Sequence, residues 1–169
     1  MIRKKNKYLK PRKLYESGRI KEENILKKNY GLKNKREIWK TVAKVTYYRR
    51  RAKELAKESL EEQQVLFNKL NALGLKVNTI AEVLDLKVEN FLDRRLPTIV
   101  LKKKLSPTIK TARQMVTHKR ILINGRVVNA PSYIVPISQE NHIALKQKQK
   151  KPKAEVKETE KVMEVEQNA

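Results

Sequence analysis

The sequence predicts an α+β protein in which a helical N-terminal region precedes a small helix–helix–β-hairpin module, with a basic N-terminal arm and a disordered C-terminal tail. Three observations predict this arrangement. Apolar residues recur at helical spacing over 35–117, an Asn-Gly pair at 124–125 separates two short apolar runs, and the last stretch is rich in Lys and Glu. We divide the 169 residues into the arm (1–20), the helical region (21–86), the module (87–145) and the tail (146–169).

The two ends differ from the centre in composition. The arm carries eight basic residues and one acid, and a segment of this kind is expected to become ordered on a polyanion. The tail has seven Lys, five Glu and no aromatic residue, so it cannot bury enough apolar surface to offset the entropy of ordering. We therefore predict a disordered tail, with an extended arm along a bound polyanion as the alternative.

Two helices are expected in the first part of the helical region. Residues 22–29 form a short helix, and Gly31 supplies the positive φ of a C-terminal cap. Asn34 and Glu37 are spaced as a capping box and open a long helix over 35–59. The residues that recur at helical spacing on its inward face are Ile38, Val42, Val45, Ala52 and Leu55.

Two shorter helices complete the helical region. One spans 60–73 and stops at Gly74. The pair Thr79 and Glu82 forms another capping box and opens a short helix that runs through Leu84.

The module begins with a helix over 88–104 that contains Pro97. Proline inside a helix removes a hydrogen bond and clashes with the preceding turn, at a cost of about 3 kcal/mol. The helix therefore either kinks at Pro97 or begins again there. Ser106 as the N-cap and Pro107 as the first residue open the next helix, which spans 108–117.

Short strands follow the two module helices. Residues 120–123 and 126–128 flank Asn124-Gly125, and both turn positions tolerate positive φ, so we expect a β-hairpin with Ile121 opposite Val128. Residues 133–137 are expected to form a third short strand. Pro136 confines that strand to an edge of the sheet.

The charge of the chain is strongly unbalanced. Lys and Arg number 41 and Asp and Glu 18, so the net charge is 41 − 18 = +23, and the pI is about 10.2. Such a charge opposes compaction unless negative charge compensates it. A nucleic acid is the favoured partner; an anionic membrane surface is the rival and would need an amphipathic basic helix.

Several classes of protein and site are excluded by composition. The chain has no cysteine, which excludes disulfides, zinc–cysteine sites, iron–sulfur clusters and thiol nucleophiles. We see no apolar run of about 18 residues that would span a membrane, and the basic start lacks the apolar stretch of a secretory signal. The two histidines lie far apart and no constellation of catalytic residues is present, so we expect no enzyme, metal, cofactor or small-molecule substrate.

Candidate nucleic-acid contacts are the Arg and Lys side chains that offer donors to phosphates, together with a helix N-terminus that favours an anion. For each of them the alternative is a solvated charge, and for Arg113 it is also an internal ion pair with Asp93. We expect charge reversal at Arg94 and Arg95 to weaken binding while the fold survives. The full set is Arg94 and Arg95 on the exposed face of the first module helix, Ser106 and Thr108 at the start of the second, Lys110, Arg113, Gln114 and Thr117 along it, His118, Lys119 and Arg120 at its end, Asn124 and Arg126 in the hairpin turn, and Lys40, Lys44, Arg50 and Arg51 on the long helix.

Three aromatic residues of the long helix could stack on unpaired bases. For Trp39 we favour packing against neighbouring helices instead. Tyr47 and Tyr48 are adjacent and cannot share a face, so one of them is expected to pack and the other to be exposed to RNA.

Two stretches carry a resemblance to a known family. FLDRRLPTIVLKKKLSPTIKTARQMVTHKRILINGRVVNAPSYIVPISQENHI (91–143) resembles the S-four-type RNA-binding module. NYGLKNKREIWK (29–40), with the long basic helix that follows, resembles the archaeal and eukaryotic branch of the small-subunit ribosomal protein S-four family. The resemblance covers residues 12–145. Within it, Arg113 and Gln114 match the family's Arg-Gln pair, and Asn124, Gly125 and Arg126 match its hairpin turn.

The resemblance implies a structural constituent of the small ribosomal subunit in the cytoplasm. Such a protein is a primary binder of 16S/18S-type rRNA, nucleates assembly of the 5′ domain, lies near the place where mRNA enters beside neighbouring ribosomal proteins, and contributes to translational accuracy. Its partners would be rRNA, those proteins and mRNA, with no membrane. The zinc knuckle of some bacterial members is absent, because the chain has no cysteine.

Two residues depart from the family's pattern, and other functions stay open. Pro97 stands where this branch usually has Gln, and Lys119 stands where many relatives have a helix-ending Gly, so Lys119 is expected in a mildly strained left-handed conformation. An RNA-modifying enzyme would need a catalytic domain for which the chain is too short. An RNA chaperone or general RNA-binding protein acting off the ribosome is the main alternative.

Overall fold

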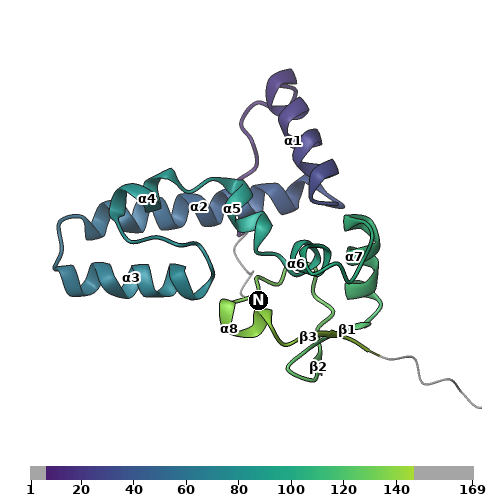
Figure 1. The fold of residues 1–169 in the computed structure, drawn as a ribbon. Helices are drawn as coiled ribbons and strands as arrows, with labels where there is room; N and C mark the ends of the chain where they lie inside the picture. The colour runs from purple at the N-terminus through teal and green to yellow at the C-terminus, as the bar shows by residue number, and fades with distance from the viewer. Residues whose placement is uncertain (1–6, 147–169) are drawn as a thin grey trace, which may run out of the picture.

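The computed structural model describes residues 7–146. The prediction of a disordered tail therefore falls, Lys146 apart, outside the described residues. Helices and a small antiparallel sheet confirm the α+β class (Figure 1). The long helix α2 (Lys35–Leu55) forms the axis of the helical part, and the smaller α/β part lies against its first turns.

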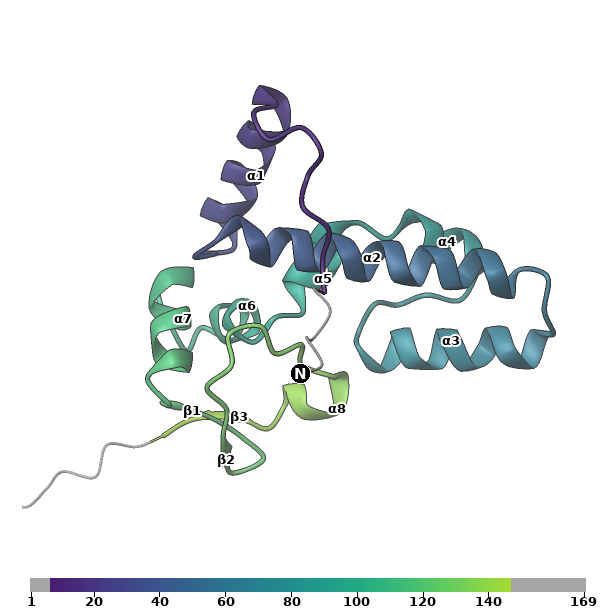
Figure 2. The ribbon, with the colours of Figure 1, turned by 180° about the vertical axis from the view of Figure 1, so that it is seen from behind.

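Helix α1 (Ser17–Asn29) begins five residues earlier than the predicted residue 22. Ion pairs one turn apart stabilise the added turn: Arg19 contacts Glu23 at 2.7 Å and Glu16 at 3.9 Å. The helix ends as predicted, with Gly31 at φ +58°. In both ribbon views α1 projects away from the rest of the fold at the N-terminal end of α2 (Figure 2).

Helix α2 differs from the prediction at both ends. The Asn34 side chain accepts no capping hydrogen bond, so the predicted capping box with Glu37 is wrong. The helix ends at Leu55 instead of Ser59, because the side-chain amide of Gln63 donates to the carbonyls of Leu55 (3.1 Å) and Glu58 (3.2 Å) and holds the chain in a turn.

Helices α3 (Leu60–Ala72), α4 (Ile80–Asp85) and α5 (Val88–Asp93) pack against α2. The predicted capping box at the start of α4 is confirmed: Thr79 accepts from the Glu82 amide at 3.3 Å and the Glu82 carboxylate accepts from the Thr79 amide at 3.4 Å. The apolar core between these helices contains Val45, Ala52, Leu55, Leu66, Leu70, Val77, Val83 and Phe91. Val42, predicted to face inward, is exposed.

The predicted helix over 88–104 is two helices. Helix α5 ends at Asp93, and α6 (Leu96–Lys102) begins with Pro97 in its first turn. Of the two alternatives at Pro97, the structure therefore has the restart, in which the proline needs no amide partner. Leu96, Ile99 and Val100 of α6 are fully buried with Ala112 and Val116 of α7 (Ile109–Thr117).

Thr108, not Ser106, caps α7. The Thr108 hydroxyl accepts from the Thr111 amide at 3.2 Å, and the Thr111 hydroxyl accepts from the Thr108 amide at 3.1 Å. Ser106 is buried, and its hydroxyl donates to the Thr108 carbonyl at 3.0 Å. The prediction of Ser106 as the N-cap and Pro107 as the first helical residue is therefore wrong, and the cap lies two residues later.

The sheet contains β1 (Ile121–Ile123), β2 (Arg126–Val127) and β3 (Ile143–Leu145) in the order β2-β1-β3, all antiparallel. The hairpin is confirmed, with Asn124 at φ +49° and Gly125 at φ +75°. Its predicted register also holds, since the Val128 amide donates to the Ile121 carbonyl at 3.2 Å.

The predicted third strand over 133–137 is wrong. This segment instead runs beside the α5–α6 junction, where the Leu96 amide donates to Tyr133 and the Val135 amide to Arg94, both at 2.9 Å. It leads into the short helix α8 (Ile137–Glu140). The third strand is β3, which pairs with β1 through Ile121–Leu145, Leu122–Ala144 and Ile123–Ile143.

Candidate nucleic-acid interface

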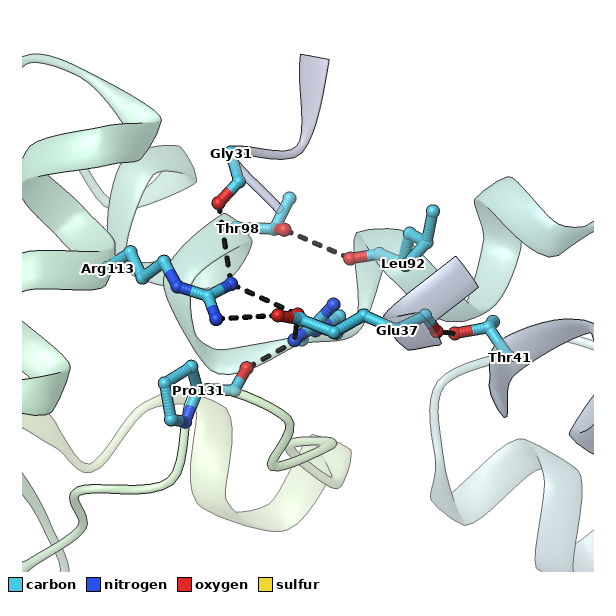
Figure 3. A network of polar contacts seen from close by, with 8 residues as sticks. Gly31, Glu37, Thr41, Leu92, Thr98, Arg113 and Pro131 are labelled. Carbon is cyan, nitrogen blue, oxygen red and sulfur yellow. Dashed lines mark hydrogen bonds and ion pairs between the residues drawn. The ribbon is translucent and has the colours of Figure 1, made fainter. Parts of the chain in front are cut away.

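Three elements meet at the carboxylate of Glu37 in the first turn of α2. Arg113 of α7 donates to both of its oxygens, at 2.7 and 3.0 Å, and Arg95 donates at 2.6 Å (Figure 3). Each arginine also donates a hydrogen bond to a backbone carbonyl: Arg113 to Gly31 at 3.4 Å and Arg95 to Pro131 at 3.2 Å. We call Glu37, Arg95 and Arg113 the Glu37 node; it joins α2 to α6 and α7.

The Glu37 node is partly desolvated, which strengthens its charge–charge interactions. Burial alone raises the pKa of Glu37, but the hydrogen bonds from Arg113 and Arg95 outweigh burial and lower that pKa to about 2. Arg95 is 6% exposed. A guanidinium in this position needs its carboxylate, because an unpaired buried charge is costly.

Arg94 is also an internal link. Its Nε donates to the Leu73 carbonyl at 3.0 Å, its Nη2 to the Val135 carbonyl at 2.9 Å, and its Nη1 to the Glu140 carboxylate at 2.8 Å. A Cβ on Gly74 would lie 2.6 Å from the Arg94 guanidinium carbon. Arg94 therefore ties the α3–α4 connection to the segment before α8.

The structure thus corrects the predicted placement of three candidate contacts. Arg94 and Arg95 do not lie on an exposed face, and Arg113 forms an internal ion pair. The alternative that the sequence leaves open for Arg113 is an internal ion pair with Asp93. The ion pair is present, but its partner is Glu37, and Asp93 instead contacts Lys102 at 3.4 Å. Charge reversal at Arg94 or Arg95 would break these links, so from the structure we expect it to destabilise the fold, whereas the sequence predicts that the fold survives.

A groove runs along α2 beside the Glu37 node. Its first part has a volume of about 490 Å³ and its second about 570 Å³. Lys7, Lys44, Phe91 and Ile134 line both parts, so the two are continuous. The first part also contains Lys40, and the second contains Tyr47 and Tyr48. We call this the α2 groove.

The α2 groove carries an excess of positive charge. Its ionisable lining is Lys7, Lys40, Lys44, Lys69, Arg95 and Arg113 against the single acid Glu37, which both arginines already use. Within residues 7–146, no carboxylate lies within ion-pair distance of Lys7, Lys40 or Lys44. Partial burial, with the positive charges of Arg95 and Lys7, lowers the pKa of Lys44.

Helix α7 and the hairpin present a second basic surface. Lys110, Gln114 and Thr117 are exposed and spaced by four and three residues, which places them on one face of α7. His118, Lys119 and Arg120 are exposed at its end, where Lys119 has φ +58° as expected from the sequence. Asn124 and Arg126 are exposed in the hairpin turn.

The remaining predicted contacts are dispersed. Arg51 shares the face of α2 that carries Lys40 and Lys44 and contacts Glu54 at 3.5 Å, whereas Arg50 lies toward another face, 3.1 Å from the same carboxylate. The Ser106 and Thr108 hydroxyls are used in local hydrogen bonds at the start of α7. The predicted set is therefore divided between the α2 groove, the surface on α7 and the hairpin, and internal links.

The aromatic residues of α2 follow the sequence expectation. Trp39 is partly buried, and its indole N–H donates to the buried carboxylate of Glu23 at 2.9 Å. Tyr48 stacks on Phe91 with ring centroids 5.6 Å apart, and Tyr47, 60% exposed, meets the Tyr48 ring edge-on at 5.4 Å. One tyrosine therefore packs and the other faces outward.

Sequence reasoning missed Lys7 and the role of Glu37. Nothing in the sequence distinguishes Lys7 from the other lysines of the basic arm, so it could not be singled out as part of the groove. Glu37 gave a misleading signal, since an acid three residues after Asn34 has the spacing of a capping box. Within residues 7–146, no group of three His, Cys, Asp or Glu side chains is arranged to hold a metal ion.

The helices of the described range include none with the length and apolar character needed to cross a membrane.

Comparison with known proteins gives a consistent result. The S4 domain family model matches residues 94–141. The chain is 41% identical over 133 residues to "Small ribosomal subunit protein uS4" of Methanococcus aeolicus, with 75% of each chain covered. The protein of the same name from Korarchaeum cryptofilum is 41% identical over 148 residues, covering 84% of this chain and 89% of the relative. That of Thermoplasma volcanium is 43% identical over 148 residues, covering 82% and 74%.

Proposed function

The chain belongs to the family of small ribosomal subunit protein uS4, and on that premise we propose that it binds the 5′ domain of small-subunit rRNA and nucleates the folding of that domain. As a member of this family, it is a structural component of the small ribosomal subunit in the cytoplasm, binds rRNA and is not an enzyme. The proposal concerns which part of the rRNA it binds and what that binding does.

One observation carries the proposal: exposed cations without carboxylate partners in the described range lie on α2, on α7 and on the hairpin that follows α7, and an internal ion pair holds α2 and α7 together. In the described range no carboxylate is within ion-pair distance of Lys40, Lys44, Lys110, Arg120 or Arg126. The Glu37 node fixes α2 against α7. Lys and Arg side chains on a rigid framework lose little entropy when they bind RNA phosphates. Such a surface recognises a folded RNA by the shape of its backbone more than by its base sequence. A protein with such a surface binds the folded form of the rRNA domain more tightly than its unfolded forms and so favours folding.

The test is footprinting of the full-length chain on naked small-subunit rRNA at raised salt with tRNA competitor. We expect localised protection in the 5′ domain that the competitor does not remove. Diffuse protection that the competitor removes would contradict the proposal and favour an RNA chaperone acting off the ribosome. Chemical probing of the same RNA with and without protein separates nucleation from binding, because a nucleating protein also orders nucleotides that it does not touch.

The number of phosphates that the protein contacts can be measured from the dependence of its rRNA affinity on salt concentration. The logarithm of affinity should fall linearly with the logarithm of salt concentration, by about 0.7–0.9 for each phosphate neutralised. Arg126→Gln should lower that slope by about one contact, whereas Lys53→Gln, an exposed lysine of α2 that lies away from the groove, should leave it unchanged. A slope close to zero would exclude binding through phosphates.

We further propose that the assembled protein lies beside the place where mRNA enters the subunit and contributes to translational accuracy. Family membership supports this, together with the extent of the basic surface on α7 and the hairpin, of which one part can contact mRNA while the rest holds rRNA. Photo-crosslinking from Lys119 or Arg126 in assembled subunits programmed with mRNA should reach mRNA on the 3′ side of the codon being decoded, in addition to rRNA. Crosslinks confined to rRNA from both positions would refute the placement.

A further inference from the structure

The α2 groove has two chemically different ends. At one end, Lys40, Lys44 and Lys7 surround a hollow of about 490 Å³ next to the Glu37 node. At the other end the groove is lined by the rings of Tyr47, Tyr48 and Phe91 and by aliphatic side chains, together with Lys7, Lys44 and Lys69. A ligand that fills both ends must combine a negative charge with a flat apolar group.

The aromatic end is a supported platform. Phe91 is buried in the core between α2 and α5, Tyr48 stacks on it with an interplanar angle of 14°, and Tyr47 abuts Tyr48. Only Tyr47 of the three is exposed. Its ring is therefore held from behind while its outer side remains open, which is the arrangement that base stacking needs at little entropic cost.

Lys40 and Lys44 of the cationic end and Tyr47 of the aromatic end lie close together on one face of α2. Lys40, Lys44, Tyr47 and Arg51 are separated by four, three and four residues, so they form one row on a face of α2. Lys44 and Tyr47 are about 4.5 Å apart along the helix axis. A phosphate at Lys44 and a base at Tyr47 can therefore belong to one nucleotide.

We propose that the α2 groove holds one unpaired nucleotide of the bound RNA, with its phosphate between Lys44 and Lys7 and its base against Tyr47. The proposal rests on the proposed function for the identity of the RNA. A paired base cannot stack on Tyr47, because in a duplex its face is covered by its stacked neighbours. An apolar peptide is disfavoured, because it would bury three lysines for which the described residues supply no carboxylate.

The first test uses three probes on the full-length isotope-labelled chain followed by NMR titration: adenosine 5′-monophosphate, adenosine and inorganic phosphate. We expect adenosine monophosphate to bind about tenfold more tightly than phosphate, a ratio within the range of one base stacked on an aromatic ring, with the largest shifts at Lys44 and Tyr47. Equal affinities for the nucleotide and phosphate would overturn the proposal, and so would shifts centred on α7 or the hairpin.

Two variants assign the ends of the site. Tyr47→Leu should bring the affinity for adenosine monophosphate down to that for phosphate and leave phosphate binding unchanged. Lys44→Gln should weaken both severalfold. The matched controls are Tyr15→Leu and Lys53→Gln, which alter exposed residues outside the groove and should change neither affinity. Tyr47 and Lys44 are both exposed, and unchanged thermal unfolding of the variants establishes that their folds are intact.

The same variants on small-subunit rRNA separate this site from the proposed function. Tyr47→Leu should weaken rRNA binding severalfold with an unchanged salt slope, and Lys44→Gln should lower the slope by roughly one phosphate. If the wild-type chain protects the 5′ domain but Tyr47→Leu binds it equally well, the nucleotide site is refuted and the proposed function stands. If adenosine monophosphate binds in the groove but the 5′ domain is not protected, the nucleotide site stands and the proposed function fails.

Discussion

Replacing Glu37 with Gln should destabilise the protein in a pH-dependent way. The variant keeps the shape of the side chain but leaves the guanidinium groups of Arg95 and Arg113 without their counter-charge, and these side chains are only 7% and 20% exposed. Removing one partner of a buried ion pair costs about 3–5 kcal/mol. Because the Glu37 node is partly accessible, we expect a loss near the lower end, about 3 kcal/mol.

The pKa of Glu37 gives the same magnitude by a separate route. It falls from the ordinary value of 4.5 to about 2, because the hydrogen bonds from the two arginines outweigh the effect of burial. At 1.36 kcal/mol for each tenfold change in proton affinity, this corresponds to about 3 kcal/mol. A carboxyl whose pKa is lowered by folding contributes fully above its unfolded value of 4.5 and loses that contribution as the pH falls towards 2.

The assay is urea unfolding of wild type and Glu37→Gln from about pH 7 down to about pH 3. The difference in unfolding free energy should be about 3 kcal/mol at neutral pH and should shrink by roughly 2 kcal/mol by pH 3, because the wild-type carboxyl is partly protonated in the unfolded and then in the folded state. Glu54→Gln is the matched control: it removes the exposed pairs with Arg50 and Arg51 and should cost less than about 1 kcal/mol at every pH. A difference that does not change with pH would refute the role assigned to Glu37.

Three further outcomes are expected. Gly74→Ala should destabilise the fold by about 2–3 kcal/mol in urea unfolding, because the residue has φ +83° and its new Cβ would displace the Arg94 guanidinium; a loss under about 0.5 kcal/mol would contradict this. Thr108→Val should cost about 1 kcal/mol by removal of the helix cap, seen as faster hydrogen exchange in the first turn of α7, and unchanged exchange there would show that the cap is dispensable. Lys119→Gly should stabilise the protein slightly, because it relieves the left-handed conformation, yet weaken rRNA binding by the loss of one cation. Tighter or equal rRNA binding would remove Lys119 from the interface.

Features that depend on neighbouring residues could be predicted from the sequence. The capping box at Thr79 and Glu82 and the turn at Asn124-Gly125 are each determined within four residues, and both are present in the structure. The positive φ of Lys119 is expected from the resemblance to the family, and it is present as well. At Pro97 the sequence predicts a kink or a restart of the helix, and the structure has the restart. Each signal is local because a cap or turn satisfies backbone groups of its own segment.

Features that depend on distant residues could not be predicted. Glu37 meets arginines that follow it by 58 and 76 residues, and no spacing rule relates such positions. An arginine that binds a phosphate and one that crosslinks two helices have the same local sequence, so Arg94 and Arg95 could not be separated from the exposed cations. Likewise, Tyr133–Ile137 has the composition of a strand, but β1 pairs with Ile143–Leu145 instead. The structure therefore leaves the predicted lysines and the hairpin turn exposed, and it places Arg94, Arg95 and Arg113 in internal ion pairs.

The Glu37 node also sets an order of events during synthesis of the chain. The N-terminal part of a nascent chain emerges and folds first, so α2 leaves the exit tunnel long before the arginine that follows Glu37 by 76 residues. Until then the carboxylate of Glu37 is hydrated and titrates as an ordinary glutamate. Closure of the node is consequently a late step that waits for α7, and a nascent chain that is stalled before that helix has emerged lacks the rigid framework on which its RNA contacts depend. The protein thus acquires its binding geometry only after α7 has been synthesised and has emerged.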